Sequence, residues 1–331
     1  MSIIDRKWIV VEPTMVQGVG YPPPPPTDPW VNNTFINDCR LLQATKYHVL
    51  SPQLKNDHAD AYFLISVIDH NIDEEIEFVK RVHSQGSKVV LAISLDSRFT
   101  SGHGLYCHNT GTLYTDLCKE VDVIWSGVSE NIHIYGNSQH KVVNAGEFVE
   151  PLNFNIPPYE GRSIDMLGTG FGGEESLSLN IVFFLMLKEK YPEKRFVYAF
   201  RNTPDYLPMI NMFRNKYPQI EYTQESFPAL LDKSKAYINI EPRPRGGRAV
   251  LEAWQHRVPS ISYSQTYWAK LFPEFAFHDL SFDKMVDLYD KLLASDYSAI
   301  IKKSEETMQY DYYEVVYKRL TNKLDGVTDV K

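Results

Sequence analysis

The sequence predicts an α/β protein with two Rossmann-like, doubly wound domains that face each other across a cleft. Three observations lead to this prediction. Short apolar runs rich in valine and isoleucine alternate with amphipathic stretches of helical length, which is typical of parallel sheets covered by helices. A proline-bearing segment without periodicity, residues 150–162, interrupts this alternation near the middle of the chain. At 331 residues, the chain is also longer than one small core requires.

The first half contains six strand candidates separated by helical or irregular stretches. They are residues 7–12, 46–51, 61–67, 88–94, 121–126 and 141–146. The stretch 73–86 begins with three acidic residues and ends with a glycine, which predicts a helix between two of them. We therefore expect a parallel sheet with helices on both faces, forming a domain of residues 1–155.

The alternation resumes after residue 162 and predicts a second parallel sheet. The expected strands are residues 163–169, 195–200, 220–223, 236–240 and 260–264, with long helical stretches at 174–192 and 204–218. From about residue 281 onward the pattern is helical and ends in a tyrosine-rich helix. The second domain is predicted to span residues 160–309.

Composition restricts the function classes. The net charge of −8 predicts no general attraction to nucleic acid or anionic membrane, so any contact with a polyanion has to be local. Three cysteines without metal-ligand spacing favour a reducing compartment. The charged N-terminus is unlike a signal peptide, and the longest apolar run, residues 181–187, is too short to span a bilayer. These features predict a cytoplasmic protein, in the host cytoplasm if the source is viral.

Residues 21–30, YPPPPPTDPW, form the one low-complexity segment. A proline run adopts an extended polyproline II conformation and forms neither a helix nor an inner strand. We favour a stiff loop after the first strand, and the alternative is a recruitment site for a proline-binding module.

The stretch 241–261, EPRPRGGRAVLEAWQHRVPSI, places a basic turn between a buried strand and a helix. Arg243, Arg245 and Arg248 repel one another unless an anion lies between them, and Gly246 and Gly247 allow a close backbone approach. Turns of this kind before a helix often bind phosphate. The alternative is that Arg243 and Arg245 are simply solvated.

The stretch 168–173, GTGFGG, is a second candidate phosphate loop, since it follows a strand and begins the long helix at residue 174. Gly170, Gly172 and Gly173 would let backbone N–H groups approach a diphosphate. Its spacing is neither that of the dinucleotide fingerprint nor that of a P-loop. A tight strand-to-helix turn is the alternative.

Residues 245–261, RGGRAVLEAWQHRVPSI, resemble the nucleotide-sugar signature of GT-B glycosyltransferases. The resemblance implies that Glu252 binds the ribose hydroxyls and that the arginines and Arg201 contact the donor. No Asp-x-Asp motif occurs, and N–H groups with arginines can neutralise a leaving diphosphate, so no metal is expected to be obligatory, although a divalent metal is left open. In retaining members an earlier glutamate contacts the sugar, and here that position is Pro244, with Glu241 three residues away. The sugar contacts and the stereochemical outcome therefore stay open.

The same resemblance assigns roles to the two halves. Residues 160–309 would hold the donor, preferably a UDP-sugar, and residues 1–155 would present the acceptor. The final helix, within about 310–331, would cross back onto the first domain, so that Tyr312 and Tyr313 become interdomain core. The loop 13–21 with Gly18 and Gly20 would approach the ligands from the acceptor side.

Sugar transfer needs a group that takes the proton of the acceptor hydroxyl or stabilises the transition state. Asp96 follows the strand at 88–94, and His103 and His108 lie in the same loop. The short SLDSR stretch at 94–98 is similar to one in the DNA β-glucosyltransferases of T-even bacteriophages, which implies Asp96 as the base. His103 is the rival base, and an Asp96 that caps a turn is the non-catalytic alternative.

The sequence therefore predicts a glycosyltransferase that uses a nucleotide-diphosphate sugar. A hydroxymethylated base in phage-type DNA is one expected acceptor, and a glycan, lipid or small molecule is the alternative. A sugar-nucleotide 2-epimerase and an inactive nucleotide-binding module are rival classes, and the oligomeric state is not predicted.

Overall fold

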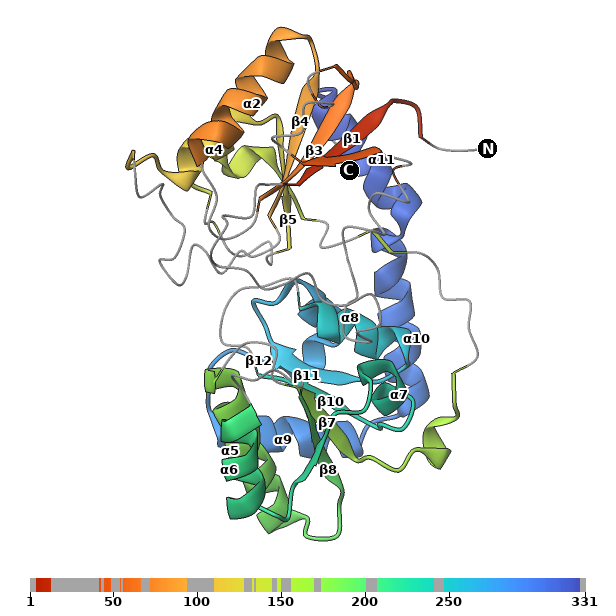
Figure 1. The fold of residues 1–331 in the computed structure, drawn as a ribbon. Helices are drawn as coiled ribbons and strands as arrows, with labels where there is room; N and C mark the ends of the chain where they lie inside the picture. Colours follow the sequence, from red (N-terminus) through yellow and green to blue (C-terminus); the bar gives the residue numbers. More distant parts are fainter. Residues whose placement is uncertain are drawn as a thin grey trace.

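The structure is a computed structural model. It describes residues 4–12, 42, 45–48, 54, 56–66, 72–93, 110–127, 133, 135–144, 148–149, 156–169, 174–200, 207–240 and 247–327. Within these residues the chain forms two parallel β-sheets with helices against them, the first sheet above the second in Figure 1. The predicted α/β class with two Rossmann-like sheets is confirmed.

The first sheet has six parallel strands in the order β2-β1-β3-β4-β5-β6. Its strands are β1 (Trp8–Glu12), β2 (Thr45–His48), β3 (Ala61–Ser66), β4 (Lys88–Ile93), β5 (Val123–Ser126) and β6 (Val142–Asn144). The order reverses at β1, because β2 lies on one side of it and β3 on the other. Loops that leave the carboxyl ends of such strands border the usual ligand crevice of doubly wound sheets.

Both faces of the first sheet are buried, because successive side chains of a strand point to opposite faces. Ile9 of β1 belongs to the core beneath α2 (Ile72–Ser84) and α4 (Tyr114–Glu120). Trp8, its neighbour, belongs to the core on the other face. A short 3-10 helix, η2 (Gly136–Lys141), leads into β6.

The second sheet also has six parallel strands, in the order β12-β11-β10-β7-β8-β9. Its strands are β7 (Met166–Thr169), β8 (Phe196–Ala199), β9 (Glu221–Thr223), β10 (Tyr237–Asn239), β11 (Ser260–Tyr263) and β12 (Ala276–Phe277). Counted from β7, this is the 3-2-1-4-5-6 order of dinucleotide-binding folds. The order reverses between β7 and β10, which are direct neighbours.

Helices cover both faces of the second sheet (Figure 1). They are α5 (Glu174–Lys190), α6 (Leu207–Lys216), α7 (Phe227–Leu231), α8 (Arg248–Gln255), α9 (Phe282–Leu293) and α10 (Tyr297–Met308). The short 3-10 turns are η3 (Tyr159–Gly161), η4 (Tyr267–Leu271), η5 (Pro273–Phe275) and η6 (Gln309–Asp311). One continuous apolar cluster of buried side chains from sheet and helices forms the core.

The last helix, α11 (Tyr313–Leu324), returns to the first sheet, as the sequence predicts. Its residues Tyr317 and Leu320 are buried in the same cluster as Trp8. The rings of Tyr313 and Phe148 pack edge to face with centroids 5.2 Å apart. In Figure 1, α10 and α11 run along one side of both sheets.

A direct contact joins the carboxyl edges of the two sheets. Tyr267 of η4, which follows β11, donates from its hydroxyl to the carbonyl oxygen of Asn144, the last residue of β6, at 2.9 Å. The first domain is predicted to end at residue 155 and the second to begin at residue 160. Because residues 150–155 lie outside the described residues, this division into two domains stays a prediction.

Candidate functional site

The start of α8 is the part of the predicted donor site that the structure describes. Gly247 is its N-cap residue, with a left-handed backbone at φ 72° and ψ 44°. Glycine has no side chain with which to cap the helix, so the first N–H groups of α8 receive no bond from the N-cap side chain. A helix start of this kind favours an anion, because its N–H groups and its dipole both attract negative charge.

Gly247 is required there for a second reason. A Cβ atom at this position would lie 1.9 Å from Cγ2 of Thr266, which is too close for any side chain. Thr266 is itself 1% exposed and immediately precedes η4. The backbone at Gly247 is thus pressed against the segment that follows β11. The sequence contains no local signal for this contact.

Arg248 and Glu252, both predicted to bind the donor, lie one turn apart on α8 and pair with each other. Nε of Arg248 donates to Oε1 of Glu252 at 2.9 Å. The two side chains are 24% and 17% exposed, while Val250 and Trp254 of the same helix are fully buried. The helix therefore presents its charged pair on the side away from the core, as spacing i, i+4 allows.

The two predicted phosphate loops are anchored on neighbouring strands. Residues 170–173 follow β7, and residues 241–246 follow β10; both loops lie outside the described residues, with Gly170, Gly172, Gly173, Arg243, Arg245 and Gly246 among them. Because β7 and β10 are parallel, with Gly168 opposite Ile238, both loops leave the same edge of the sheet. This edge is where the strand order reverses, the usual ligand position in such folds.

Close packing holds this edge together. A Cβ atom on Gly168 would lie 2.9 Å from Cζ of Phe184 and 3.3 Å from Cγ2 of Ile238, so only glycine lets α5 approach β7 this closely. The hydroxyl of Thr169, the last residue of β7, lies 2.7 Å from the hydroxyl of Tyr237, the first residue of β10, and this contact connects the two strands. The first glycine of the GTGFGG stretch thus has a packing role.

The other predicted site residues lie outside the described residues, and their roles stay predictions. Asp96 and His103 are in the segment that follows β4. In the first sheet, β4 lies between β3 and β5. Gly18 and Gly20 follow β1, and Arg201 follows β8.

Arg162 was not among the predicted residues, yet it fixes the far end of α8. Its guanidinium is buried and donates to the carbonyl oxygens of His256 at 2.9 Å and Arg257 at 3.0 Å, at the end of the helix. It also donates to Ser234 and Pro157. Burial lowers the pKa of Arg162, but a cation at a helix C-terminus is favourable. Arg162 lies in the proline-bearing linker stretch, where no periodicity marks it.

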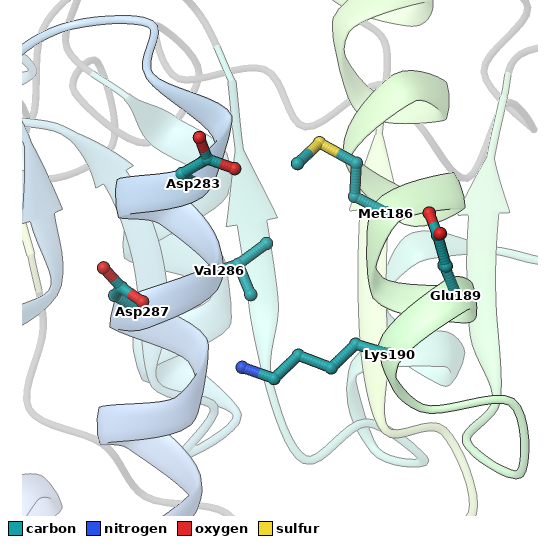
Figure 2. Close-up of a pocket in the computed structure, with 6 residues that line it drawn as sticks. All are labelled: Met186, Glu189, Lys190, Asp283, Val286 and Asp287. Atoms are coloured by element: carbon teal, nitrogen blue, oxygen red, sulfur yellow. The ribbon is translucent and has the colours of Figure 1, made fainter.

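A shallow pocket lies in a different place, between α5 and α9 (Figure 2). Its lining residues are Met186, Glu189, Lys190, Asp283, Val286 and Asp287. Lys190 extends across the gap toward α9 and forms an ion pair with Asp290. The three carboxylates of the lining would repel a nucleotide diphosphate. The lining residues of α5 belong to the C-terminal half of that helix, which leads to the amino end of β8 and not to the carboxyl ends of the strands, where the predicted phosphate loops begin.

The described residues contain neither a metal site nor a membrane-spanning helix. No group of three or more histidine, cysteine or acidic side chains in the described ranges is placed to hold a metal ion. None of the helices among these residues combines the length and the apolar character that a bilayer crossing requires.

Comparison with known proteins identifies the fold. No protein-family model matches the chain, and no curated protein matches its sequence. Solved structures do match. The pneumococcal O-GlcNAc transferase GtfA, in complex with UDP and GlcNAc, aligns with a TM-score of 0.55 and 12% identity over 83% of this chain and 58% of that one.

Two further structures agree with this assignment. S. aureus TarM, in complex with fondaparinux, alpha-GlcNAc-glycerol and UDP, aligns with a TM-score of 0.52 and 12% identity over 78% of this chain and 59% of that one. A UDP-forming trehalose-phosphate synthase from Burkholderia vietnamiensis aligns with a TM-score of 0.52 and 10% identity over 80% and 72%. The chain thus has the GT-B glycosyltransferase fold, and it spans less than two thirds of GtfA and TarM.

Proposed function

We propose that the protein is a glycosyltransferase that takes its sugar from a nucleotide-diphosphate donor, preferably a UDP-sugar. One observation carries the proposal: the Gly247–Glu252 start of α8 follows a strand at the point where the order of a GT-B sheet reverses. UDP appears with two of the similar structures, and a third is described as UDP-forming.

In this proposal, the start of α8 binds the donor's pyrophosphate and ribose. Arg248, with Arg243 and Arg245, neutralises the diphosphate, since guanidinium groups match pairs of phosphate oxygens. Glu252 accepts hydrogen bonds from the ribose hydroxyls. The N–H groups at the start of α8 and the glycine loop at 170–173 would stabilise the charge on the leaving diphosphate.

For the acceptor, we propose a hydroxyl of a glycan or a small molecule. The named structures involve GlcNAc, a GlcNAc-glycerol and trehalose phosphate, and give no support to DNA as the acceptor. The net charge of −8 also disfavours DNA. The modified DNA base expected from the SLDSR stretch is therefore replaced by the alternative acceptor class.

The test is the stabilisation of the protein by UDP. Ligand binding to the folded state raises the free energy of unfolding by RT ln(1 + [L]/Kd), about 2.7 kcal/mol at a hundredfold excess over Kd. We expect UDP to raise Tm, and Glu252→Gln to remove most of this rise. Glu221→Gln is the matched control, because Glu221 also pairs with an arginine, Arg195, but at the start of β9.

The outcome separates the function classes. If UDP and GDP leave Tm unchanged, the donor site is absent; if Glu252→Gln keeps the full rise, the ribose role is wrong. Release of UDP from a UDP-sugar only when a saccharide acceptor is added supports transfer, whereas conversion of the donor alone identifies an epimerase.

A further inference from the structure

Thr266 and Tyr267 are neighbours in sequence, but they contact different parts of the molecule. The methyl group of Thr266 packs on Gly247, at the start of α8. The hydroxyl of Tyr267 bonds to the carbonyl oxygen of Asn144, at the end of the first sheet. Two consecutive residues therefore connect the proposed donor helix to the opposite sheet.

Asp311 holds Tyr267 in this position. Its carboxylate is 1% exposed, and Oδ1 accepts a hydrogen bond from the Tyr267 hydroxyl at 2.6 Å. Nζ of Lys270 lies 2.8 Å from Oδ2, and Nη2 of Arg319 lies 3.5 Å from Oδ1. Two cations thus compensate the buried charge, as a carboxylate at this depth requires.

The phenol of Tyr267 has one proton and faces two acceptors, Asp311 and Asn144. One proton cannot form a full hydrogen bond to both acceptors, so a small displacement of η4 would strengthen one of the two bonds and weaken the other. A hydrogen bond to a carboxylate is stronger than one to a neutral carbonyl, so Asp311 holds the ring more firmly than the first sheet does.

The cluster lies where the chain crosses between the sheets. Asp311 is in η6, directly before α11, which packs on the first sheet. Val149, on the outgoing crossing, forms an isolated parallel bridge with Tyr312 and accepts a bond from the N–H of Tyr313 at 2.7 Å. Any movement of one sheet relative to the other would therefore involve these paired segments.

We propose that Tyr267, anchored by Asp311, is a positioning residue that sets the angle between the two sheets according to the occupancy of α8. A diphosphate at Gly247 shifts the contact with Thr266, η4 follows, and the bond from Tyr267 to Asn144 changes. This inference rests on the proposed function, since it requires a nucleotide at α8.

The test measures the distance between the sheets with spin labels. Cysteines replace Lys80 in α2 and Lys216 in α6, both exposed, in a chain whose native cysteines are changed to alanine. Tyr267→Phe removes only the bridging hydroxyl. Tyr289→Phe is the matched control, because Tyr289 is equally buried in the core of the second sheet, away from the crossings.

We expect UDP to shift the distance distribution of the parent protein and of Tyr289→Phe. Tyr267→Phe should bind UDP within about threefold of the parent affinity, but its distribution should be broader without nucleotide and should not respond to UDP. A general loss of stability would not remove the response to UDP selectively. Parent-like distributions of Tyr267→Phe in both states would overturn the inference.

The two proposals fail in different ways. If UDP does not raise Tm, the proposed function fails, and the breadth of the nucleotide-free distribution still tests the anchoring role: equal breadth in Tyr267→Phe and Tyr289→Phe rejects it. If UDP raises Tm but does not shift the parent distribution, the proposed function stands and the coupling is wrong.

Discussion

Arg248 donates to Glu252 across 2.9 Å, so the two α8 residues proposed to bind the donor are partners in the structure. Their proposed roles differ, because a guanidinium suits phosphate and a carboxylate suits ribose hydroxyls. One turn of helix separates them, and a ligand with both groups reaches both side chains from the same direction. Nucleoside and nucleotide should therefore respond differently to the loss of each.

The first prediction concerns Arg248→Gln. Hydrogen bonds to charged groups contribute roughly 1.5–3 kcal/mol, so the affinity for UDP should fall about tenfold or more. The affinity for uridine, which lacks phosphate, should stay nearly unchanged, whereas Glu252→Gln should weaken both ligands. Titration calorimetry with UDP and uridine measures this. An equal loss of uridine and UDP affinity in Arg248→Gln would contradict the phosphate role.

The second prediction concerns Gly247→Ala, with Gly111→Ala as its matched control. Both glycines have a left-handed backbone, at φ 72° and 71°, but a Cβ on Gly111 meets no atom within 4 Å. Gly111→Ala should thus lose only about 1–2 kcal/mol of unfolding free energy to backbone strain. Gly247→Ala adds the collision with Thr266 and should lose roughly 1–3 kcal/mol more. Urea unfolding of both variants measures the difference, and equal losses would show that Thr266 gives way freely.

The sequence predicts the strands well, because buried parallel strands are continuous apolar runs, as at residues 61–66 and 88–93. It does not predict β12, since Ala276–Phe277 is too short to show a pattern. It places Arg248 and Glu252 on one helix because their spacing is local. The contacts of Thr266 and Arg162 escape it, because their partners lie far along the chain and only the folded sheet brings them together.

The third prediction concerns Arg162→Met. This variant removes the donor from the buried carbonyl oxygen of Ser234 and from partly buried ones, including that of His256. An unsatisfied buried acceptor costs about 1–3 kcal/mol, so the unfolding free energy should fall by at least ~3 kcal/mol in total. Arg195→Met, which breaks the half-exposed pair with Glu221, should lose about 1 kcal/mol or less. Chemical denaturation of both variants compares them, and similar losses would mean that water replaces the guanidinium of Arg162.

The fourth prediction concerns the proposed base. Asp96→Asn should lower kcat by about 10²–10⁴, the usual contribution of general acid–base catalysis, while the UDP-induced rise in Tm stays unchanged. His103→Asn should then have a smaller effect on kcat. Steady-state transfer to the acceptor identified in the saccharide screen measures both variants. The reverse order of the two effects would assign the base role to His103.

The last prediction concerns acid stability. Burial alone would raise the pKa of Asp122, but hydrogen bonds from the N–H of Val89 and from His83, both 2.8 Å long, and the nearby Lys88 outweigh it and lower this pKa. A carboxyl whose pKa is lower in the folded state stabilises the protein above its unfolded pKa of about 3.9. This contribution is lost as the pH falls through the folded value.

Urea unfolding between about pH 6 and pH 3 tests this assignment with Asp122→Asn. At the upper end of this range the variant should be less stable than the parent protein, because the amide that replaces the carboxylate carries no charge to pair with Lys88. Below about pH 4 the difference between the two unfolding free energies should shrink as the pH falls, and it should disappear once the pH is below the lowered folded-state pKa, where the parent carboxylate is protonated and loses the same interactions. A difference that stays constant down to the lowest pH would mean that Asp122 stabilises the fold through its shape and hydrogen bonds, and not through its charge.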